Sequence, residues 1–246
     1  MKTVLIHGQN HEGSSCHMGR MLADKIASPG EQREFFLPRD LNHFCSGCFR
    51  CVQNEENCPY YEDKKKIMDA VAEAEVLIFT TPTYCMHASA PMKSFLDLTF
   101  TNWMNHRPKE YMFSKKAVIL SSAAGMGTGS AIKDIKTALT YWGIPKIYSF
   151  GLAVQAMNWE QVPGEKKSVI EKNTDRIAKK LLKKKKPSVG IKTRALFFMM
   201  MKMQAAGWGA SPEEKEYWEK KGWLEKVRPW ENTEQCSSVG CSADNN

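Results

Sequence analysis

The sequence predicts an α/β fold in which helices cover both faces of one parallel sheet. Strand-like and helix-like segments alternate over the first two-thirds of the 246 residues. The strand-like segments are short and apolar and do not alternate cleanly, as expected for strands buried on both faces. We therefore expect a three-layer, doubly wound sheet, for which five strands most often take the order 2-1-3-4-5.

Five strands are expected, because five short runs are rich in β-branched and aliphatic residues. They are Thr3 to His7, Arg33 to Leu37, Val76 to Thr80, Ala117 to Ser121, and Pro145 to Phe150 with a continuation toward Val154. The third strand is expected to stop at Pro82, because proline cannot donate a ladder hydrogen bond.

Five helices are expected between and after these strands, because apolar residues recur there at spacings of three and four. They cover Met18 to Ile26, Ile67 to Ala74, Pro91 to Thr99, Ile132 to Leu139, and Val169 to Leu182. After Pro187, a stretch rich in Met and Trp indicates one or two further helices. The expected division is a sheet domain over 1–186, a helical extension over 187–230 and a disordered tail over 231–246.

Composition and charge restrict the partners. No apolar run is long enough to span a bilayer, and the first residues turn polar too soon for a signal peptide, so we expect a cytoplasmic protein without a membrane partner. Much of the net charge of +8 comes from six lysines between Lys179 and Lys186. No aromatic residue is interleaved with them, so we interpret the run as a solvated helix end rather than a nucleic-acid site.

Ligands of open parallel sheets bind beyond the carboxyl ends of the strands, where the strand order reverses. In the expected order, this point lies between the first and third strands. Three loops should converge there: Gly8 to Ser15, Pro82 to His87, and Ser121 to Thr128.

The first of these loops runs from a strand into a helix and is rich in Gly and Ser. Backbone N–H groups and hydroxyls at a helix start bind phosphate well. Ser14 stands where a triphosphate-binding loop needs lysine, so a phosphate monoester fits better. The simpler alternative is a helix cap at Ser14 or Ser15. In the other two loops, Tyr84 offers a ring for packing, and glycines such as Gly125 let the backbone approach a flat ligand.

Four of the eight cysteines fall within fourteen residues, in the pattern C-x2-C-x2-C-x6-C. They are Cys45, Cys48, Cys51 and Cys58. In a reducing compartment, such clustering indicates metal or redox chemistry rather than disulfides. A [4Fe–4S] cluster, structural zinc, a redox dithiol and plain thiols all remain open.

These motifs resemble the NADPH-dependent FMN reductase and flavodoxin superfamily, and within it the iron–sulfur flavoproteins. The likeness covers about the first 185 residues. It is carried by Gly8 to Ser15, Pro82 to Tyr84 with Pro91 to Asp97 behind it, Ser121 to Gly127, and Cys45 to Cys51. The resemblance implies a flavodoxin-like fold with FMN as cofactor and NAD(P)H as co-substrate. It also implies that all four cysteines hold a [4Fe–4S] cluster.

The resemblance further implies that the first loop holds the FMN phosphate and that the other two flank the isoalloxazine ring. The implied cofactor-binding residues are Gln9, His11, Ser14, Ser15, Pro82, Thr83, Tyr84, Cys85, Met86, Ala123, Ala124, Gly125 and Gly127. Relatives often have Ser-Pro-Arg where this chain has Gln9-Asn10-His11. His11 or His17 can replace that arginine, or both are surface residues. Cys16 and Cys85 are either packed residues or, for Cys85, a reactive thiol near the ring.

The expected function is electron transfer from NAD(P)H, or from a redox protein such as ferredoxin, through FMN to a flavin, quinone, nitro or azo acceptor. The cofactor does the chemistry, so no catalytic side chain is assigned. No second G-x-G-x-x-G motif is present, so a nicotinamide would stack transiently on the flavin.

The alternatives are an electron-transfer iron–sulfur flavoprotein and a redox-sensing protein without a small-molecule substrate. We also expect a homodimer or homotetramer. The Met- and Trp-rich extension should bury against its own core or a partner subunit, and it is a candidate lid over a neighbouring flavin site.

Overall fold

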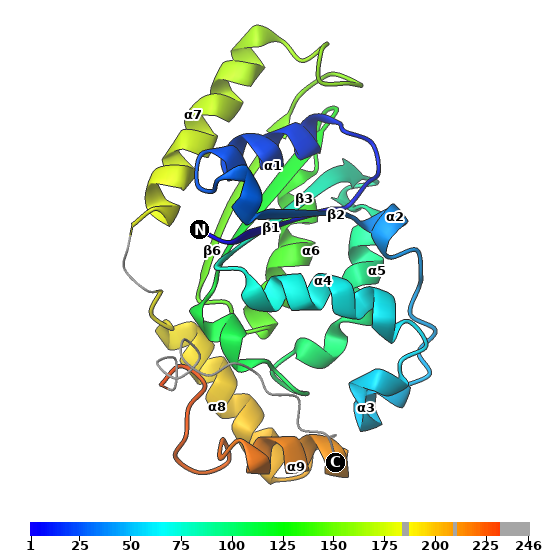
Figure 1. Ribbon diagram of the computed structural model, residues 1–246, viewed down its shortest axis with the longest axis vertical. Helices are drawn as coiled ribbons and strands as arrows, with labels where there is room; N and C mark the ends of the chain where they lie inside the picture. The colour runs from blue at the N-terminus through cyan, green and yellow to red at the C-terminus, as the bar shows by residue number, and fades with distance from the viewer. Residues whose placement is uncertain (184–186, 209–210, 232–246) are drawn as a thin grey trace.

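The computed structural model describes residues 1–183, 187–208 and 211–231. Its strands are β1 (Thr3–His7), β2 (Gln32–Phe36), β3 (Val76–Tyr84), β4 (His87–Ala88), β5 (Lys116–Ala123) and β6 (Lys146–Ala153). The five long strands form a parallel sheet in the order β2-β1-β3-β5-β6, while β4 pairs only with β3 (Figure 1). The short strand β4 was not among the five predicted strands, so β5 and β6 are the predicted fourth and fifth strands. The predicted order 2-1-3-4-5 is therefore confirmed.

Nine α-helices occur in the described residues. They are α1 (Ser14–Asp24), α2 (Leu37–Asp40), α3 (Arg50–Gln53), α4 (Tyr61–Glu73), α5 (Ala90–Leu98), α6 (Thr128–Tyr141), α7 (Gly164–Leu181), α8 (Ile191–Ala205) and α9 (Pro212–Lys220). The five predicted helices of the sheet domain correspond to α1, α4, α5, α6 and α7. The single-turn helices α2 and α3 were not predicted, because four residues carry no measurable periodicity.

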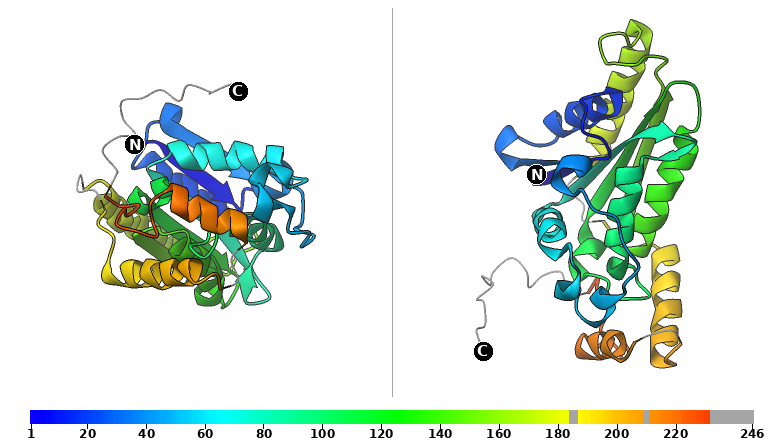
Figure 2. Two further views of the ribbon diagram at one scale, coloured as in Figure 1. Left: turned by 90° about the horizontal axis from the view of Figure 1, so that it is seen from below. Right: turned by 90° about the vertical axis from the view of Figure 1, so that its right-hand side faces the viewer.

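Two helical layers enclose the sheet, with α1 and α7 on one face and α4, α5 and α6 on the other (Figures 1 and 2). Successive strand residues point to opposite faces. Val4 and Ile6 accordingly belong to the core under α4 to α6, while Leu5 belongs to the core under α1 and α7. Both faces are apolar, which is why the strands read as continuous hydrophobic runs.

The predicted end of the third strand at Pro82 is wrong, since β3 continues to Tyr84 and turns back into β4. The pairing of β1 with β3 ends at His7 opposite Thr80. Pro82 therefore lies where one side of β3 no longer has β1 as a neighbour, while it still faces Ser122 of β5. A proline is tolerated there, because its missing N–H leaves no gap in the ladder with β1.

The extension forms its own small core. Helices α8 and α9 pack around Phe197, Trp218 and Trp223 against Met104 and Phe113 of the segment before β5. The extension therefore lies at the amino end of the strands, in the lower part of Figure 1. The central aromatic residues of the extension are therefore buried against the extension's own chain, which is one of the two possibilities expected, the other being a partner subunit.

Two expectations fall partly outside the described residues. Lys179 and Lys180 end α7, as expected for a solvated helix end, whereas Lys184, Lys185 and Lys186 lie outside the described part. Residues 232–246 of the expected disordered tail also lie outside it. No helix in the described ranges is both long and apolar enough to cross a membrane.

Replacing Trp218 by Ala should destabilise the extension strongly. Trp218 is fully buried and stacks on Phe197 at 5.0 Å between ring centroids. Removing a buried Trp side chain typically costs about 3–5 kcal/mol of unfolding free energy. Urea unfolding monitored by circular dichroism measures the loss. Trp208→Ala is the matched control, since Trp208 is 72% exposed and its removal should cost well under about 1 kcal/mol. Equal losses would contradict the packing described here.

Candidate functional site

The first two predicted loops are joined where they leave the sheet. The Gly8 N–H donates to the Thr80 carbonyl at 2.8 Å, and the Ser89 hydroxyl donates to the Gly8 carbonyl at 2.6 Å. A Cβ atom at position 8 would lie 2.5 Å from the Ser89 Oγ. Only glycine permits this approach, so the start of the first loop is held against the root of the second.

The amino end of α1 offers free hydrogen-bond donors. Gly13 is its N-cap and supplies no side-chain cap, so the interpretation of Ser14 or Ser15 as a simple cap is wrong. Both serines lie instead in the first turn, where they are largely buried. The first N–H groups of a helix have no intrahelical partner and carry the positive end of its dipole. These donors and the two hydroxyls together form a cradle suited to a phosphate.

The two candidate histidines occupy different places. The His11 ring lies against Gly13, with Nε2 only 2.7 Å from where a Cβ at that position would be. His11 is therefore beside the start of α1. His17 stacks instead on Trp159 of the loop after β6, with 4.8 Å between ring centroids. His11 is thus the better placed of the two to meet a phosphate. The side chain of Gln9, another residue of this loop, accepts a hydrogen bond from the Asn10 N–H at 3.1 Å.

The second loop is a tight hairpin between β3 and β4. Its two central residues, Cys85 and Met86, have φ of +48° and +69°, as in a type I′ turn. Such angles are uncommon for non-glycine residues and are typical of functional sites. Cys85 is exposed at the turn, so its interpretation as a packed residue is wrong.

The third loop packs directly on this hairpin. Gly127 has φ of +96°, and a Cβ there would lie 2.9 Å from both the Met86 Sδ and the Thr83 Cγ2. The Asp134 carboxylate of α6 accepts the Ala88 N–H and contacts the His87 Nδ1, each at 3.0 Å. The three loops therefore form one continuous surface at the carboxyl edge of the sheet.

Exposed apolar side chains on this surface surround the backbone at Gly125, which no side chain covers. Tyr84, Met86 and Met126 are exposed, and no heavy atom lies within 4 Å of a Cβ position at Gly125. Ala124 is exposed beside it, whereas Ala123 is buried at the end of β5. A flat, largely apolar ring can lie here against both side chains and backbone.

Sequence reasoning missed the loop after β6 as a fourth contributor. Met157 is strongly exposed there, and Trp159 meets His17 from α1. The signal was available, because any loop that follows a parallel strand reaches the same edge of the sheet.

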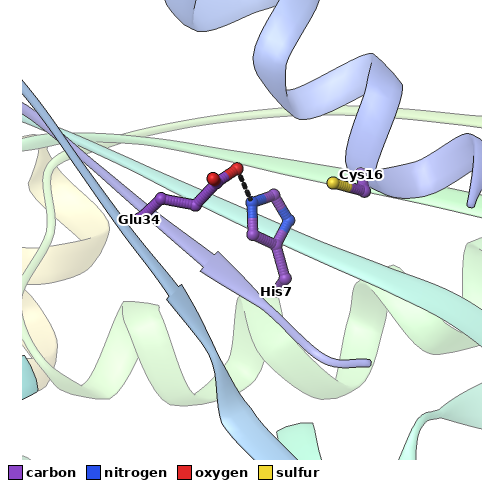
Figure 3. Close-up of side chains that lie close together, drawn as sticks. All are labelled: His7, Cys16 and Glu34. Carbon is purple, nitrogen blue, oxygen red and sulfur yellow. Dashed lines mark hydrogen bonds and ion pairs between the residues drawn. The ribbon is translucent and has the colours of Figure 1, made fainter. Parts of the chain in front are cut away.

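A partly buried charge network begins at buried His7, reaches the first loop, and was not predicted (Figure 3). His7 is 1% exposed and contacts the Thr80 Oγ1 and the Glu34 carboxylate, each at 2.7 Å. Arg20 donates to both Glu34 oxygens and also pairs with Glu12 of the first loop at 2.7 Å. Burial alone would raise the pKa of Glu34, but hydrogen bonds from His7 and Arg20 outweigh it and lower the pKa to about 2.

Cys16 adjoins this network without joining it by a hydrogen bond (Figure 3). Its sulfur, a His7 nitrogen and a Glu34 oxygen lie within 4.8 Å of one another, the only such group of three in the described residues. Burial raises the pKa of Cys16 to about 11, and both Glu34 oxygens already accept from Arg20. We therefore interpret Cys16 as a packed thiol rather than a metal ligand.

The four clustered cysteines line one cavity of about 310 Å³. Cys51 is buried, Cys58 is half-buried, and Cys45 and Cys48 are exposed. The Arg50 N–H lowers the pKa of Cys48, whereas burial raises that of Cys51. The rest of the cavity wall includes Pro59, Tyr60, Asp97, Leu98 and Phe100.

The fold and the site define a class: a flavodoxin-like protein with an uncapped helix start and exposed apolar side chains at the switch point of its sheet. A model of the NADPH-dependent FMN reductase family matches residues 1–157. The chain belongs to this family. Membership confirms the expectation of an FMN-binding, NAD(P)H-dependent oxidoreductase.

Similar proteins are consistent with this assignment. An iron–sulfur flavoprotein of Archaeoglobus fulgidus is 23% identical over 116 residues, which are 46% of this chain and 57% of that protein. An FMN-dependent NADH:quinone oxidoreductase of Pelagibacter ubique is 26% identical, over 65% of this chain and 92% of that protein. The structure of an FMN-dependent NADH-azoreductase from Bacillus anthracis, in complex with FMN, shares the fold with a TM-score of 0.54 and 11% identity, covering 72% of this chain and all of that one.

Glu34→Gln should weaken stability in a pH-dependent way. Because the folded-state pKa of Glu34 lies below its unfolded value, its contribution is present above about pH 4.5 and is lost as the pH falls toward 2. The variant should lose at most about 3.5 kcal/mol of unfolding free energy at pH 7, following about 1.4 kcal/mol per pKa unit over the fall from 4.5 to about 2. Urea unfolding at pH 7 and pH 4 measures the difference, which should shrink at the lower pH. A loss independent of pH would contradict the network.

Proposed function

We propose that this chain transfers electrons from NAD(P)H through FMN to a small-molecule acceptor of the quinone, nitro or azo type. The observation that carries the proposal is the continuous surface of three loops at the switch point, with a phosphate cradle at one end and exposed apolar side chains at the other. The relatives named a quinone oxidoreductase and an azoreductase support these acceptor classes.

The residues at this edge have distinct roles in the proposal. Ser14, Ser15 and the first N–H groups of α1 hold the phosphate, with His11 beside them. The Thr83 to Met86 hairpin and the backbone at Gly125 and Gly127 lie along the ring. Bound FMN supplies the hydride and electron chemistry, while the protein supplies position and a partly apolar setting.

The reductant and the acceptor are proposed to use the same surface in turn. In the part of the chain that the structure describes, no second sheet forms another nucleotide-binding unit. Tyr84, Met86 and Met126 are exposed on this surface, so the ring would be accessible from solvent. A nicotinamide can therefore stack on the ring, leave, and be replaced by an acceptor.

We further propose that Cys45, Cys48, Cys51 and Cys58 hold a [4Fe–4S] cluster. Their shared cavity supports it, as does the relative named an iron–sulfur flavoprotein. Exposed Cys45 and Cys48 leave one side of the cavity open to a redox partner such as ferredoxin. This openness also favours the second candidate, an electron-transfer protein that does not turn over a small substrate.

The setting proposed for this activity is the cytoplasm, where a reducing environment keeps the six described cysteines free, as they are in the structure. A homodimer or homotetramer is proposed on the exposed apolar residues of the extension, which include Ile191, Met199 and Trp208.

Ser14→Asp should abolish tight FMN binding, because a carboxylate would then occupy the phosphate cradle. We expect the Kd for FMN to rise at least about 100-fold, a loss of about 2.7 kcal/mol. Fluorescence quenching of FMN on titration with apoprotein measures it. Ser168→Asp adds the same charge to an exposed position of α7 and should leave the Kd unchanged. Unchanged affinity in Ser14→Asp would remove the cradle from the proposal.

Steady-state kinetics should separate the two candidate functions. Oxidation of NADH and NADPH is followed at 340 nm under nitrogen, with a benzoquinone, a nitroaromatic or an azo dye as acceptor. Successive use of one surface predicts parallel lines in double-reciprocal plots. Intersecting lines would contradict the shared surface. Absence of turnover with every acceptor, despite bound FMN, would favour the electron-transfer protein.

A further inference from the structure

His87 is the most exposed of the four histidines that contact a carboxylate in the described residues. Its side chain is 65% exposed, against 2% for His7, 36% for His43 and 22% for His106. The His87 Nδ1 lies 3.0 Å from the Asp134 carboxylate of α6. An ion pair this exposed contributes little to stability, so a structural role alone explains the contact poorly.

The backbone that carries His87 is held in place, although the side chain reaches solvent. The Asp134 oxygen that meets the His87 ring also accepts the Ala88 N–H at 3.0 Å. The next residue, Ser89, donates its N–H to the Thr81 hydroxyl at 3.0 Å. The position of His87 at the edge of the hairpin is therefore fixed by contacts to both α6 and β3.

His87 lies on the same side of the hairpin as Tyr84. The two residues are direct partners in the pairing of β3 with β4, and opposite residues of an antiparallel pair point to one face. The next pair, Thr83 and Ala88, points to the other face, where Ala88 joins the core. Tyr84 is exposed on the surface proposed for the flavin ring. A ring that contacts Tyr84, and an acceptor stacked on that ring, therefore have His87 at their border.

The contact with Asp134 decides which nitrogen of His87 exchanges a proton. An ionised carboxylate can only accept a hydrogen bond, so Nδ1 keeps its hydrogen in both the neutral and the charged imidazole. The other nitrogen, Nε2, has no hydrogen-bond partner in the part of the chain that the structure describes. Nε2 is therefore the atom that gains and loses a proton.

The proposed acceptors need a proton source of this kind. A quinone that takes up a hydride becomes a hydroquinone monoanion, and one further proton completes the hydroquinone. An azo bond likewise needs one hydride and one proton to become a hydrazine. Ferricyanide, by contrast, takes up a single electron and no proton. A positioned acid should therefore speed the first two reactions and leave the third unchanged.

We propose that His87 is a catalytic residue that donates its Nε2 proton to the quinone or azo acceptor, and that Asp134 positions it. The hydride brings two electrons and one hydrogen to the acceptor, and the charged imidazole of His87 supplies the second hydrogen as a proton. Neutral His87 then regains a proton from solvent. The inference rests on the proposed function and names the acid of its second half-reaction. Asp134 is a positioning residue, because its bonds in the described residues go to His87 and Ala88.

This role gives the acceptor reaction a pH dependence of known sign. Donation needs the charged imidazole, so the rate of acceptor reduction should fall as the pH rises through about 5 to 8, the range in which histidines titrate. The titratable groups beside His87 are Asp134 from α6, Tyr84 from β3 and Cys85 in the turn. Of these, Asp134 is the one that bonds to the ring in the described residues.

The test compares His87→Asn and Asp134→Asn with the control Asp69→Asn. The new amide in His87→Asn can still donate to Asp134, so the hairpin stays anchored while Nε2 is removed. Asp69 pairs with Lys65 on exposed positions of α4, a helix that contributes to none of the three loops.

Two kinds of measurement are made on each full-length protein. Anaerobic stopped-flow spectroscopy of the FMN-loaded protein separates flavin reduction by NADH from reoxidation by benzoquinone, an azo dye or ferricyanide, each between pH 5 and pH 9. Nitrogen-15 NMR of the imidazole rings, with and without FMN, shows which nitrogen of His87 carries the proton. Circular dichroism verifies that each variant folds.

His87→Asn should reduce benzoquinone and the azo dye at least about 100-fold more slowly, the usual contribution of a positioned acid, and should lose the fall in rate with rising pH. Its reduction by NADH and its reoxidation by ferricyanide should stay unchanged. Asp134→Asn should show an intermediate loss. In the NMR spectra of this variant, the proton of neutral His87 should no longer be confined to Nδ1. The control should match the wild type throughout.

Wild-type rates with benzoquinone and the azo dye in His87→Asn would overturn the inference and leave the proposed function intact. Equal slowing with ferricyanide would also overturn it, because a merely structural role would affect every acceptor. A wild-type protein that holds FMN but reduces neither benzoquinone nor the azo dye would overturn the proposed function itself. If His87→Asn fails to fold, Asp134→Asn decides, and an unchanged azo rate with an unchanged tautomer of His87 overturns the inference.

Discussion

The pairing of β1 with β3 is the constraint on which the rest of this structure depends. It places β1 between β2 and β3. The connections that follow β1 and β3 at the carboxyl edge therefore lead to opposite faces of the sheet, to α1 on one face and to α5 on the other. The pairing stops at His7 and Thr80, and directly beyond it Gly8 bonds to the Thr80 carbonyl. From this point the first loop turns toward α1, while β3 runs on into its hairpin.

Polar groups at this point, several of them only half-buried, also join the first loop to the sheet. His7 connects Thr80 of β3 to Glu34 of β2, and Arg20 carries the connection to Glu12 in the first loop. Each charge has an opposite charge or a hydrogen-bond donor beside it, which is the condition for burying such groups without large cost. A preorganised loop does not need to be ordered again when a ligand binds, so more of the binding energy appears as affinity.

The cysteine cavity lies at a distance from this edge, and α5 connects the two regions. Its N-cap residue, Ser89, holds Gly8 at the first loop, while Asp97 and Leu98 at its other end line the cysteine cavity. One short helix thus contributes to both sites. The extension joins from the opposite side through the segment that carries Arg107, which donates to the Gln53 carbonyl in the cysteine loop. The molecule therefore has two chemically different regions that one helix connects.

Local sequence determined the strands, the main helices and the loops of the proposed flavin site, because apolar period, glycine placement and strand-to-helix order are properties of neighbouring residues. It misplaced the end of β3, since whether Pro82 disturbs a ladder depends on where β1 stops. It gave no sign of the His7–Glu34–Arg20 network or of Arg107 beside the cysteine loop. These residues are remote from their partners in sequence, and an isolated Arg or His carries no periodic signal. Only the tertiary structure decided which buried charges meet, because burial and pairing are set by contacts between distant segments.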